Sequence, residues 1–453
     1  MKLLRTPGYL NWVMPLMIAL AAGDVLLSGR NLSQVYAELA GLADTSRSPL
    51  MPWIQRGVSL VLLLICAERI ANHFAEKRTM PSAVLAWTYV AFWLCTVASP
   101  ALLGSHRQIS HEFAYALVIG FAAMLVTTEE IGPIADRARD ALFVLLLVSV
   151  CLMPVWPTLV LDESYTQGLL PGLPRLGGLA PHPVAMGMFA QTALMLLWAR
   201  PYGSRWLNAL AWLLGLATLF LAQSKTSWIA FILCSLAMIA VRHGPAMWRK
   251  LGDPREGAAG ILLCLAVMFM GVATLVLVLF TNAGGSLSDF LDTEQGAQLM
   301  TLTGRDQIWA VAWEEWSANK WFGYGPSLFN DDFRLAIHMP YATSAHNQFM
   351  DTLARSGSIG AAMLVIYAVV LLAMSLRYAR RTGGLSVALF IALAMRSVSE
   401  VPLGLFGYGI EFFAHLLLLV TLAAAASARS QAMRPQPQRG WAASSGRREG
   451  VPA

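Results

Sequence analysis

The sequence predicts an all-helical integral membrane protein. Hydrophobic residues make up 57% of its 453 residues and charged residues 13%, and the mean hydropathy is +0.57. A soluble domain has about 25% charged residues. Apolar segments as long as a bilayer-spanning helix requires, roughly 17–25 residues, recur along nearly the whole chain. Composition and recurrence together exclude an ordinary soluble enzyme.

The apolar segments predict twelve transmembrane helices, at residues 9–28, 50–71, 82–103, 112–128, 140–160, 181–199, 205–222, 226–241, 258–281, 357–376, 384–401 and 408–427. The first follows Lys2 and Arg5 and resembles a signal peptide, but Asp24 lies just beyond the candidate cleavage site. Since eleven more spans follow, we expect an uncleaved first helix. Residues 1–428 would then form one polytopic domain, and the Pro- and Arg-containing segment 429–453 a disordered basic tail.

Lysine and arginine residues predict the orientation. With both chain ends in the cytoplasm, twenty of the 32 basic residues fall in inner segments and eleven on the outer side. Cytoplasmic segments carry such an excess. The same distribution accounts for the net charge of +6, so no nucleic-acid partner is indicated.

Cysteine usage indicates neither a metal site nor disulfide bonds. All five cysteines lie in apolar spans, and no two stand in a C-x-x-C spacing. The nearest approach to a carboxylate metal motif is Asp331-Asp332, which we interpret as a solvated turn. We therefore expect no metal and no cofactor.

Besides the outer loop that follows the first span, two outer loops are substantial. They are the Gly- and Pro-rich segment 161–181 and the segment 282–356 between spans 9 and 10. In the second, apolar residues recur at near-helical spacing over 305–321, which predicts an amphipathic helix beside the membrane. Residues 344–356 predict a short helix, with Ser344 as its N-cap and Gly357 as its C-terminal stop.

The balance of acidic and basic residues in the large loop indicates whether this loop could bind an anion. Residues 282–356 hold nine acidic and four basic residues, so this surface does not attract anions generally. An anion site needs cations from several loops, and the candidates are Arg175, Lys225, Arg305 and Arg355. A charge near hydrocarbon costs on the order of 2.5–3.5 kcal/mol, so it needs a partner or a purpose. Arginine grips phosphate oxygens in a fork and lysine adds a point charge, which suits a pyrophosphate group.

Each candidate also has a structural interpretation. Arg305 stands next to Asp306 and would form an ion pair at a helix start, and Lys225 would snorkel to the interface. Arg175 would bond carbonyls in a loop without regular structure. His182, between two prolines, would be structural, and His346 would only cap or pack against a helix. The roles of Arg355 and Glu400 stay open between the two interpretations.

The sequence resembles the O-antigen ligase/polymerase superfamily of membrane glycosyltransferases over roughly residues 170–400. The resemblance rests on His346-Asn347 followed by Gly357-Ser-Ile-Gly360, on Thr-Gly-Arg305, on the cation in the turn Gln223-Ser-Lys225-Thr-Ser-Trp228, and on the large outer loop before the third-last span. Within the superfamily, length, span count and loop position are most similar to the O-antigen ligase family. That turn usually carries arginine in the family, so Lys225 keeps the charge but loses the bidentate fork.

The resemblance implies a GT-C-like fold and a transfer reaction. The donor would be an O-antigen polysaccharide on undecaprenyl pyrophosphate, and the acceptor a sugar hydroxyl of the lipid A–core oligosaccharide. Transfer would occur at the periplasmic face of a Gram-negative inner membrane, surrounded by membrane lipids, with inversion at the anomeric carbon and without a metal.

The residue types fit this chemistry. A neutral imidazole accepts a proton near pH 7, so His346 is the expected general base. Arg305 is expected to act in catalysis and, with Lys225 and Arg175, to bind the donor pyrophosphate. Further substrate contacts are expected from four residues: Asn347, Arg355, His182 and Glu400.

Three alternatives remain open. A polymerase would use the same donor and chemistry with a second lipid-linked glycan as acceptor, and a protein O-oligosaccharyltransferase would be expected to have a longer chain. A transporter of lipids or glycans also fits twelve spans, but transporter folds often contain repeated halves. Here no half-repeat is evident and the polar residues gather at one outer edge, which favours an enzyme.

Overall fold

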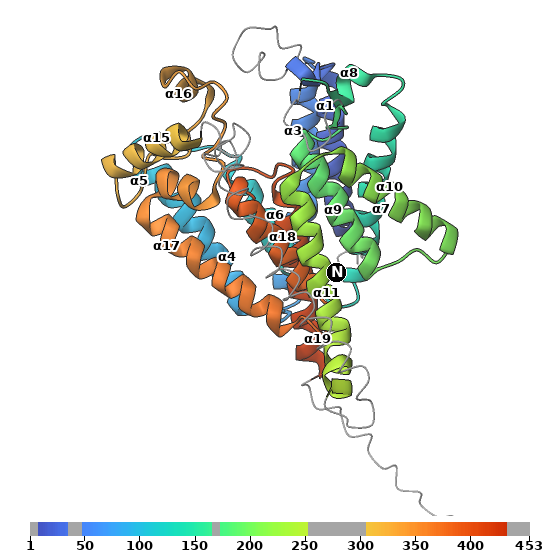
Figure 1. Ribbon diagram of the computed structural model, residues 1–453. Helices are drawn as coiled ribbons and strands as arrows, with labels where there is room; N and C mark the ends of the chain where they lie inside the picture. The colour runs from blue at the N-terminus through green and yellow to red at the C-terminus, as the bar shows by residue number, and fades with distance from the viewer. Residues whose placement is uncertain (1–7, 35–47, 165–172, 252–304, 433–453) are drawn as a thin grey trace, which may run out of the picture.

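The computed structural model describes residues 8–34, 48–164, 173–251 and 305–432 (Figure 1). The described chain is helical apart from one pair of two-residue strands. In chain order the helices are η1 (Tyr9–Trp12), α1 (Val13–Ser28), η2 (Leu32–Gln34), α3 (Met51–Ala75), α4 (Ala83–Trp93), the π-helical turn η3 (Leu94–Ala98), α5 (Ser99–Leu103), α6 (Phe113–Ala123), α7 (Ile131–Cys151), α8 (Pro157–Val160), α9 (Pro183–Ala199), α10 (Arg205–Leu221), α11 (Lys225–Leu251), α15 (Arg305–Ala318), α16 (Asp331–Ala336), α17 (Gln348–Arg377), α18 (Leu385–Ser399) and α19 (Phe412–Ala432).

The helices confirm an all-helical membrane protein. Among the described residues, six helical segments are long and apolar enough to cross a bilayer: Tyr9–Ser28, Met51–Ala75, Ala83–Leu103, Lys225–Gly244, Gln348–Arg377 and Phe412–Arg429. The helices α6, α9, α10 and α18 are shorter and also apolar. Each predicted span on described residues overlaps a helix, whereas the ninth, 258–281, lies outside them. The last helix continues to Ala432, past the predicted start of the tail at 429.

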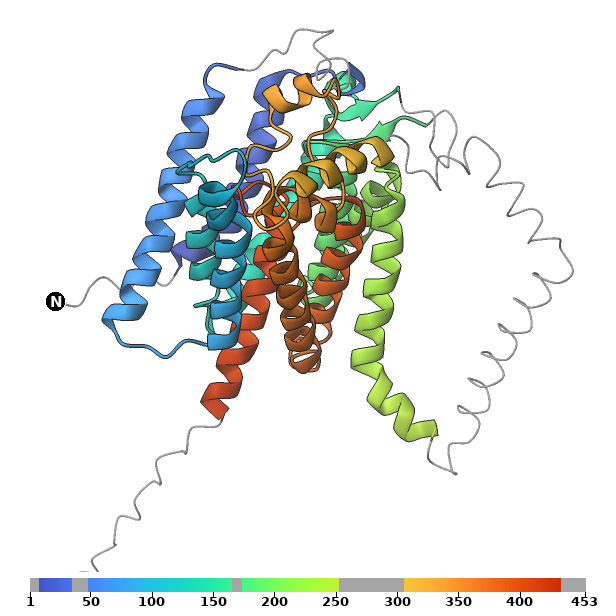
Figure 2. The ribbon, with the colours of Figure 1, turned by 90° about the vertical axis from the view of Figure 1, so that its left-hand side faces the viewer.

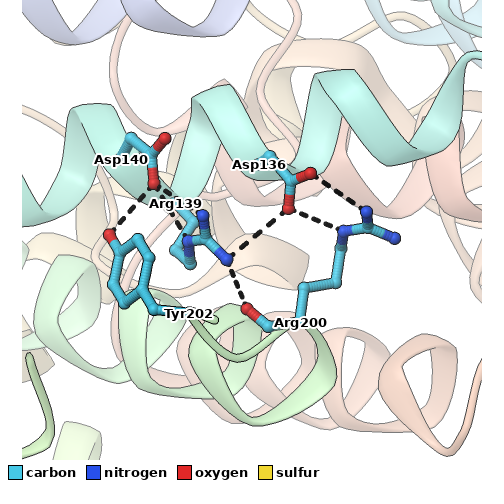
Figure 3. A network of polar contacts seen from close by, with 5 residues as sticks. All are labelled: Asp136, Arg139, Asp140, Arg200 and Tyr202. Atoms are coloured by element: carbon cyan, nitrogen blue, oxygen red, sulfur yellow. Dashed lines mark hydrogen bonds and ion pairs between the residues drawn. The ribbon is translucent and has the colours of Figure 1, made fainter. Parts of the chain in front are cut away.

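Helix α7 departs most from the expected bounds. It covers Ile131–Cys151 rather than 140–160, because prolines at 154 and 157 end it early. Its charged first half is stabilised as a helix by side-chain pairing. Figure 3 shows the network, in which Arg139 and Arg200 pair with carboxylates and a tyrosine hydroxyl donates to one of them; its members are Asp136, Arg139, Asp140, Arg200 and Tyr202.

The Gly- and Pro-rich loop has regular structure that the sequence did not predict. Strand β1 (Leu161–Asp162) pairs antiparallel with β2 (Arg175–Leu176), and Asp162 lies opposite Arg175. This corrects the expectation of a loop without regular structure around Arg175. The pairing holds that residue next to the start of α9.

Helix α17 joins the predicted short helix and the following span. Its N-cap is Asn347, whose Oδ1 accepts from the amides of Phe349 and Met350 at 3.0 Å each. The expectation of Ser344 as N-cap was wrong. The Ser344 hydroxyl instead accepts from the amide of His346 at 3.2 Å, in a local turn that precedes the helix.

Gly357 breaks α17 where the predicted stop stands. Its φ of 64° and ψ of −168° are not helical, and a Cβ atom there would lie 2.3 Å from the carbonyl carbon of Trp321. On either side of the break, the Ser358 amide donates to the Lys320 carbonyl at 2.8 Å, and the Ser356 hydroxyl donates to the Thr96 carbonyl at 2.8 Å. The break therefore joins α17 to the segment after α15 and to η3.

A large apolar core lies between the helices. Phe92 of α4 and Tyr367 of α17 stack with ring centroids 4.6 Å apart, and Figure 1 shows these two helices side by side. A second, smaller core lies beneath α15 and α16 and includes Ile308, Phe329 and Phe333. It anchors α15, which confirms the helix expected in 305–321.

Candidate active site

Loops distant in sequence meet at one end of the bundle, which carries the β1–β2 pair, α15 and α16 and which we call the loop-rich end (Figure 2). Arg30, after α1, donates to the carbonyls of Gly178 at 3.2 Å and Ala180 at 2.7 Å. His106, after α5, donates its amide to the Tyr324 carbonyl at 2.7 Å, and the two rings stack. The predicted outer loops therefore pack against one another, as a composite site requires.

His346 stands at this end in an unusual backbone conformation. Its φ is 47°, in the left-handed region that few residues other than glycine adopt. Neighbours on both sides hold it there: the Asp351 carboxylate accepts from the Ala345 amide at 3.1 Å, and Asn347 caps α17. Such strained positions cluster at functional sites.

The imidazole of His346 faces the carboxylate of Glu400. The distance from Nδ1 to Oε2 is 3.4 Å, and the side chains are 25% and 17% exposed. The two residues are 54 positions apart, and Glu400 follows the last residue of α18. Among the described residues no hydrogen bond engages Nε2 of His346, so this nitrogen is available to a substrate. A carboxylate behind one ring nitrogen and an available second nitrogen is the arrangement of an oriented general base.

Glu400 is surrounded by groups that favour its ionised form. Burial alone would raise the pKa of this carboxyl, but the hydrogen bond with His346 and the electrostatic interactions with His182, His346 and Arg396 outweigh it, so the pKa lies below its usual value. The carboxylate is therefore ionised at neutral pH. In that form it accepts a hydrogen bond from Nδ1–H of His346 and fixes the ring orientation.

Arg305 lies directly beside this pair. Its guanidinium donates to the backbone carbonyl of His346 at 3.4 Å. In the described chain no ion pair joins it to Asp306, so the helix-start pair is not formed. Burial lowers the pKa of Arg305 and the nearby charge of Glu400 opposes this shift; an arginine stays charged in either case. The structure thus brings Arg305, His346 and Glu400 together.

His182 lies near enough to Glu400 and to Arg175 to interact with both charges. The His182 Nδ1 accepts from the Ala185 amide at 3.2 Å and caps α9. Burial lowers the pKa of His182 to about 4; Glu400 opposes this shift, and Arg396, Arg175 and Arg30 add to it. The ring is therefore neutral at pH 7. The Arg175 Nε donates to the Ala222 carbonyl at 2.9 Å, which is the carbonyl contact that the structural interpretation expected.

Lys225 belongs to the turn that Arg175 contacts. The turn is held to the preceding loop by Gln223, whose side chain donates to the Leu173 carbonyl at 2.9 Å. Lys225 itself begins α11 and is exposed. Among the described residues it makes no direct contact with His346 or Glu400. Arg175 is therefore the candidate residue to which the turn of Lys225 is joined.

Asn347 and Arg355 are engaged in holding the structure. The Asn347 side chain caps α17 and donates to the Val398 carbonyl at 3.3 Å. The Arg355 guanidinium pairs with Asp351 at 2.8 Å and donates to the Pro326 carbonyl at 2.8 Å. Among the described residues, neither side chain forms a hydrogen bond or an ion pair with the side chain of His346 or Glu400. Both support the segment in which His346 lies.

An apolar groove adjoins the site. It has a volume of about 450 Å³ and runs between α17 and α18, past Leu364, Val369 and Phe390. Its lining includes Asn347 and Val398, which stand next to His346 and two residues before Glu400. A chain lying in the groove would place its polar end beside the pair.

Two charged residues at this site were not predicted. Arg30 gave no signal, since it stands in an outer loop without a motif. Arg396 could have been found, because it is a basic residue inside the apolar span 384–401, which it shares with Glu400. It is buried and pairs with Glu411.

Acidic residues of the large loop do not assemble a metal site within the part of the chain that the structure describes. No group of three or more His, Cys, Asp or Glu side chains gathers there. Asp331 pairs with Arg334 in the first turn of α16. Cys66, Cys95, Cys151 and Cys234 are free thiols, and Cys264 lies outside the described residues.

A family model covers part of the chain that forms this site. Residues 209–365, about a third of the chain, match the model described as O-antigen ligase, Wzy_C, whose enzymes transfer lipid-linked glycans. No curated protein matches the chain. The matched segment contains Lys225, Arg305 and His346, and the contacts above join it to Arg175, His182 and Glu400 outside it. Residues 209–365 of this helical membrane protein are thus similar to the O-antigen ligase family, Wzy_C.

Proposed function

We propose that this protein is an O-antigen ligase, which transfers O-antigen polysaccharide from undecaprenyl pyrophosphate to a sugar hydroxyl of lipid A–core and so completes lipopolysaccharide. The observation that carries the proposal is the His346–Glu400 pair beside Arg305, at the mouth of an apolar groove. The similarity of residues 209–365 to the O-antigen ligase family model supports the class of donor, a lipid-linked O-antigen.

The proposal places the site at the periplasmic face of a Gram-negative inner membrane. It requires twelve spans in a GT-C-like arrangement, with residues 258–281 as the ninth and both termini cytoplasmic. Two features support this sidedness. The loop-rich end contains the predicted outer loops, and Lys77, Arg137, Arg200 and Arg377 lie in the predicted inner segments, where basic residues concentrate.

Donor binding is assigned to the cations around the pair. Arg305, Arg175 and Lys225 would stabilise the negative charge that grows on the pyrophosphate as the glycosidic bond breaks. Arg305 has the strongest support, because its guanidinium lies next to His346 and is partly withdrawn from water. The groove between α17 and α18 would accommodate an apolar chain of a lipid-bound substrate at the same time.

The transfer step needs a base and no redox partner. The acceptor hydroxyl oxygen attacks the anomeric carbon from the face opposite the pyrophosphate, and the carbon–oxygen bond to pyrophosphate breaks with its electron pair. The hydroxyl proton passes to Nε2 of His346. Glu400 holds Nδ1–H and stabilises the imidazolium that forms. Both reactants are lipid-bound, so holding them in one orientation supplies much of the acceleration.

Acceptor choice tests the ligase assignment. The purified protein in liposomes receives radiolabelled undecaprenyl pyrophosphate-linked O-antigen together with lipid A–core. A ligase moves label to lipid A–core in one step. Label that appears only on a longer lipid-linked glycan would assign a polymerase, and label that crosses the bilayer without covalent transfer would assign a transporter.

A further inference from the structure

Arg396 is a buried cation that the proposed reaction has not used. It lies in the last turn of α18, and its side chain is 8% exposed. It is the one charged residue in the sequence of that helix, between Leu385 and Ser399. Since a charge at such a position is costly, it requires a compensating partner.

Its partner is Glu411, at the far end of the connection to α19. The guanidinium of Arg396 pairs with the Glu411 carboxylate, which is 38% exposed. Within the same connection, the Leu403 amide donates to the Gln348 side chain at 2.7 Å. The ion pair therefore joins the two ends of the segment 400–411. Gln348 attaches that segment to the start of α17, close to His346.

Glu400 begins this closed segment. Its amide donates to the Arg396 carbonyl at 2.8 Å, so the two residues share one helical turn. His346, before α17, bonds to the Glu400 carboxylate, and three further groups lie close enough to interact with its charge: His182 before α9, Arg305 in α15 and Arg396 in α18. Of these, Arg396 lies in the last turn of α18, directly before the C-cap Glu400, and is fixed by an ion pair.

We propose that Arg396, held by Glu411, is a positioning residue for the transfer reaction: it fixes the Glu400 carboxylate against His346. The inference rests on the proposed function. Arg396 acts through Glu400, and its direct bond is to Glu411 rather than to His346. A purely structural ion pair would stabilise the connection between α18 and α19 without influencing the base.

The test compares loss of the charge at Arg396 with loss of a similarly buried arginine charge away from the candidate site. Arg396→Gln removes the charge, Arg396→Lys keeps it, and Arg396→Gln combined with Glu411→Gln removes both partners, so that no unpaired charge remains. The matched control is Arg139→Gln, which removes a guanidinium that is also 8% exposed and paired with carboxylates in the network of Figure 3. Transfer to lipid A–core is measured as kcat and KM against pH, together with thermal unfolding.

We expect kcat of Arg396→Gln to fall on the order of 10²-fold while KM for the donor changes little, because the base is misplaced and the donor is held by other cations. The acid side of the kcat profile should move to higher pH. The reason is that a carboxylate that has lost a neighbouring guanidinium takes up a proton at higher pH and then no longer accepts from Nδ1. Arg396→Lys should recover most of the rate.

The double variant and the control separate positioning from stability. The double variant should regain thermal stability but keep the low kcat and the shifted profile, whereas Arg139→Gln should lose stability with a normal profile. If the double variant instead recovers kcat, or if its profile matches that of the wild type, Arg396 is only structural. Failure of the wild-type protein to label lipid A–core would be a different result, against the proposed function itself.

Discussion

At the scale of single residues, the site depends on how His346 is held. Its left-handed backbone comes from a local turn on one side and the Asn347 cap on the other. Sequence reasoning identified His346 and Arg305, since a histidine and an arginine on an outer loop stand out in an apolar chain. It could not establish the pairing of His346 with Glu400, because 54 residues separate them and only the folded chain brings them together.

Replacing Glu400 with glutamine tests that pairing. The amide keeps the size of the side chain but carries no charge, so the imidazolium formed during transfer loses its stabilisation, and kcat should fall by about 10²-fold or more. In the wild type, the lowered pKa of Glu400 keeps this carboxyl ionised to a pH below the usual carboxyl range. The stability that its ionised form contributes is present at neutral pH and is lost as the pH falls through its folded value. Thermal unfolding of the glutamine variant should depend less on pH in that acid range, and an unchanged kcat would remove Glu400 from the reaction.

The N-cap of α17 gives a second residue-scale prediction. Asn347→Ala removes the side-chain oxygen that accepts from two amides, so it should lower the free energy of unfolding by about 0.5–2 kcal/mol. Ser344→Ala is the matched control and should cost less, because Ser344 accepts from one amide outside the helix. Equal losses in thermal unfolding would contradict Asn347 as the cap.

At the scale of elements, apolar runs predicted helix positions well where packing or proline did not intervene. The bounds of α3, α10 and α18 lie close to expectation, whereas α7 is displaced because its charged turn pairs with Arg200. The joining of two predicted elements into α17 depends on Gly357. Sequence identified this glycine as a stop, but the close approach of Trp321 that requires it is a tertiary contact.

Gly357→Ala tests that close approach. The backbone conformation of Gly357 is nearly exclusive to glycine, and a Cβ atom would overlap the backbone of Trp321, so the free energy of unfolding should fall by about 1–3 kcal/mol or more. Gly23→Ala in α1 serves as the control, since no atom lies within 4 Å of its Cβ position. A Gly357 variant as stable as the Gly23 variant would mean that α17 continues without the break.

At the scale of the whole molecule, loops from separate parts of the chain gather at one end, and the candidate residues gather with them (Figure 2). Charge asymmetry predicted this grouping from the sequence, since the outer loops are the ones that meet. The closeness of particular loops, such as Arg30 to the segment before His182, follows from side-chain bonds that no local pattern reveals.

The sidedness of the two ends is open to direct labelling. In a cysteine-free background, Ile109→Cys lies in the connection between α5 and α6 at the loop-rich end, where Ile109 is 79% exposed. Lys77→Cys lies in an exposed connection between α3 and α4. A membrane-impermeant thiol reagent added to spheroplasts should label position 109 and spare position 77. The reverse pattern would place the candidate site in the cytoplasm.

Single-turnover transfer with His346→Gln tests the central claim most directly. Labelled donor is first bound to the purified protein and its dissociation constant is measured, and lipid A–core is then added. The account predicts donor binding within a few-fold of the wild type and a transfer rate lower by about 10²–10⁴-fold, because only proton removal from the acceptor is lost. A variant that transfers at the wild-type rate, or one that loses donor binding and transfer in equal measure, would contradict His346 as the base.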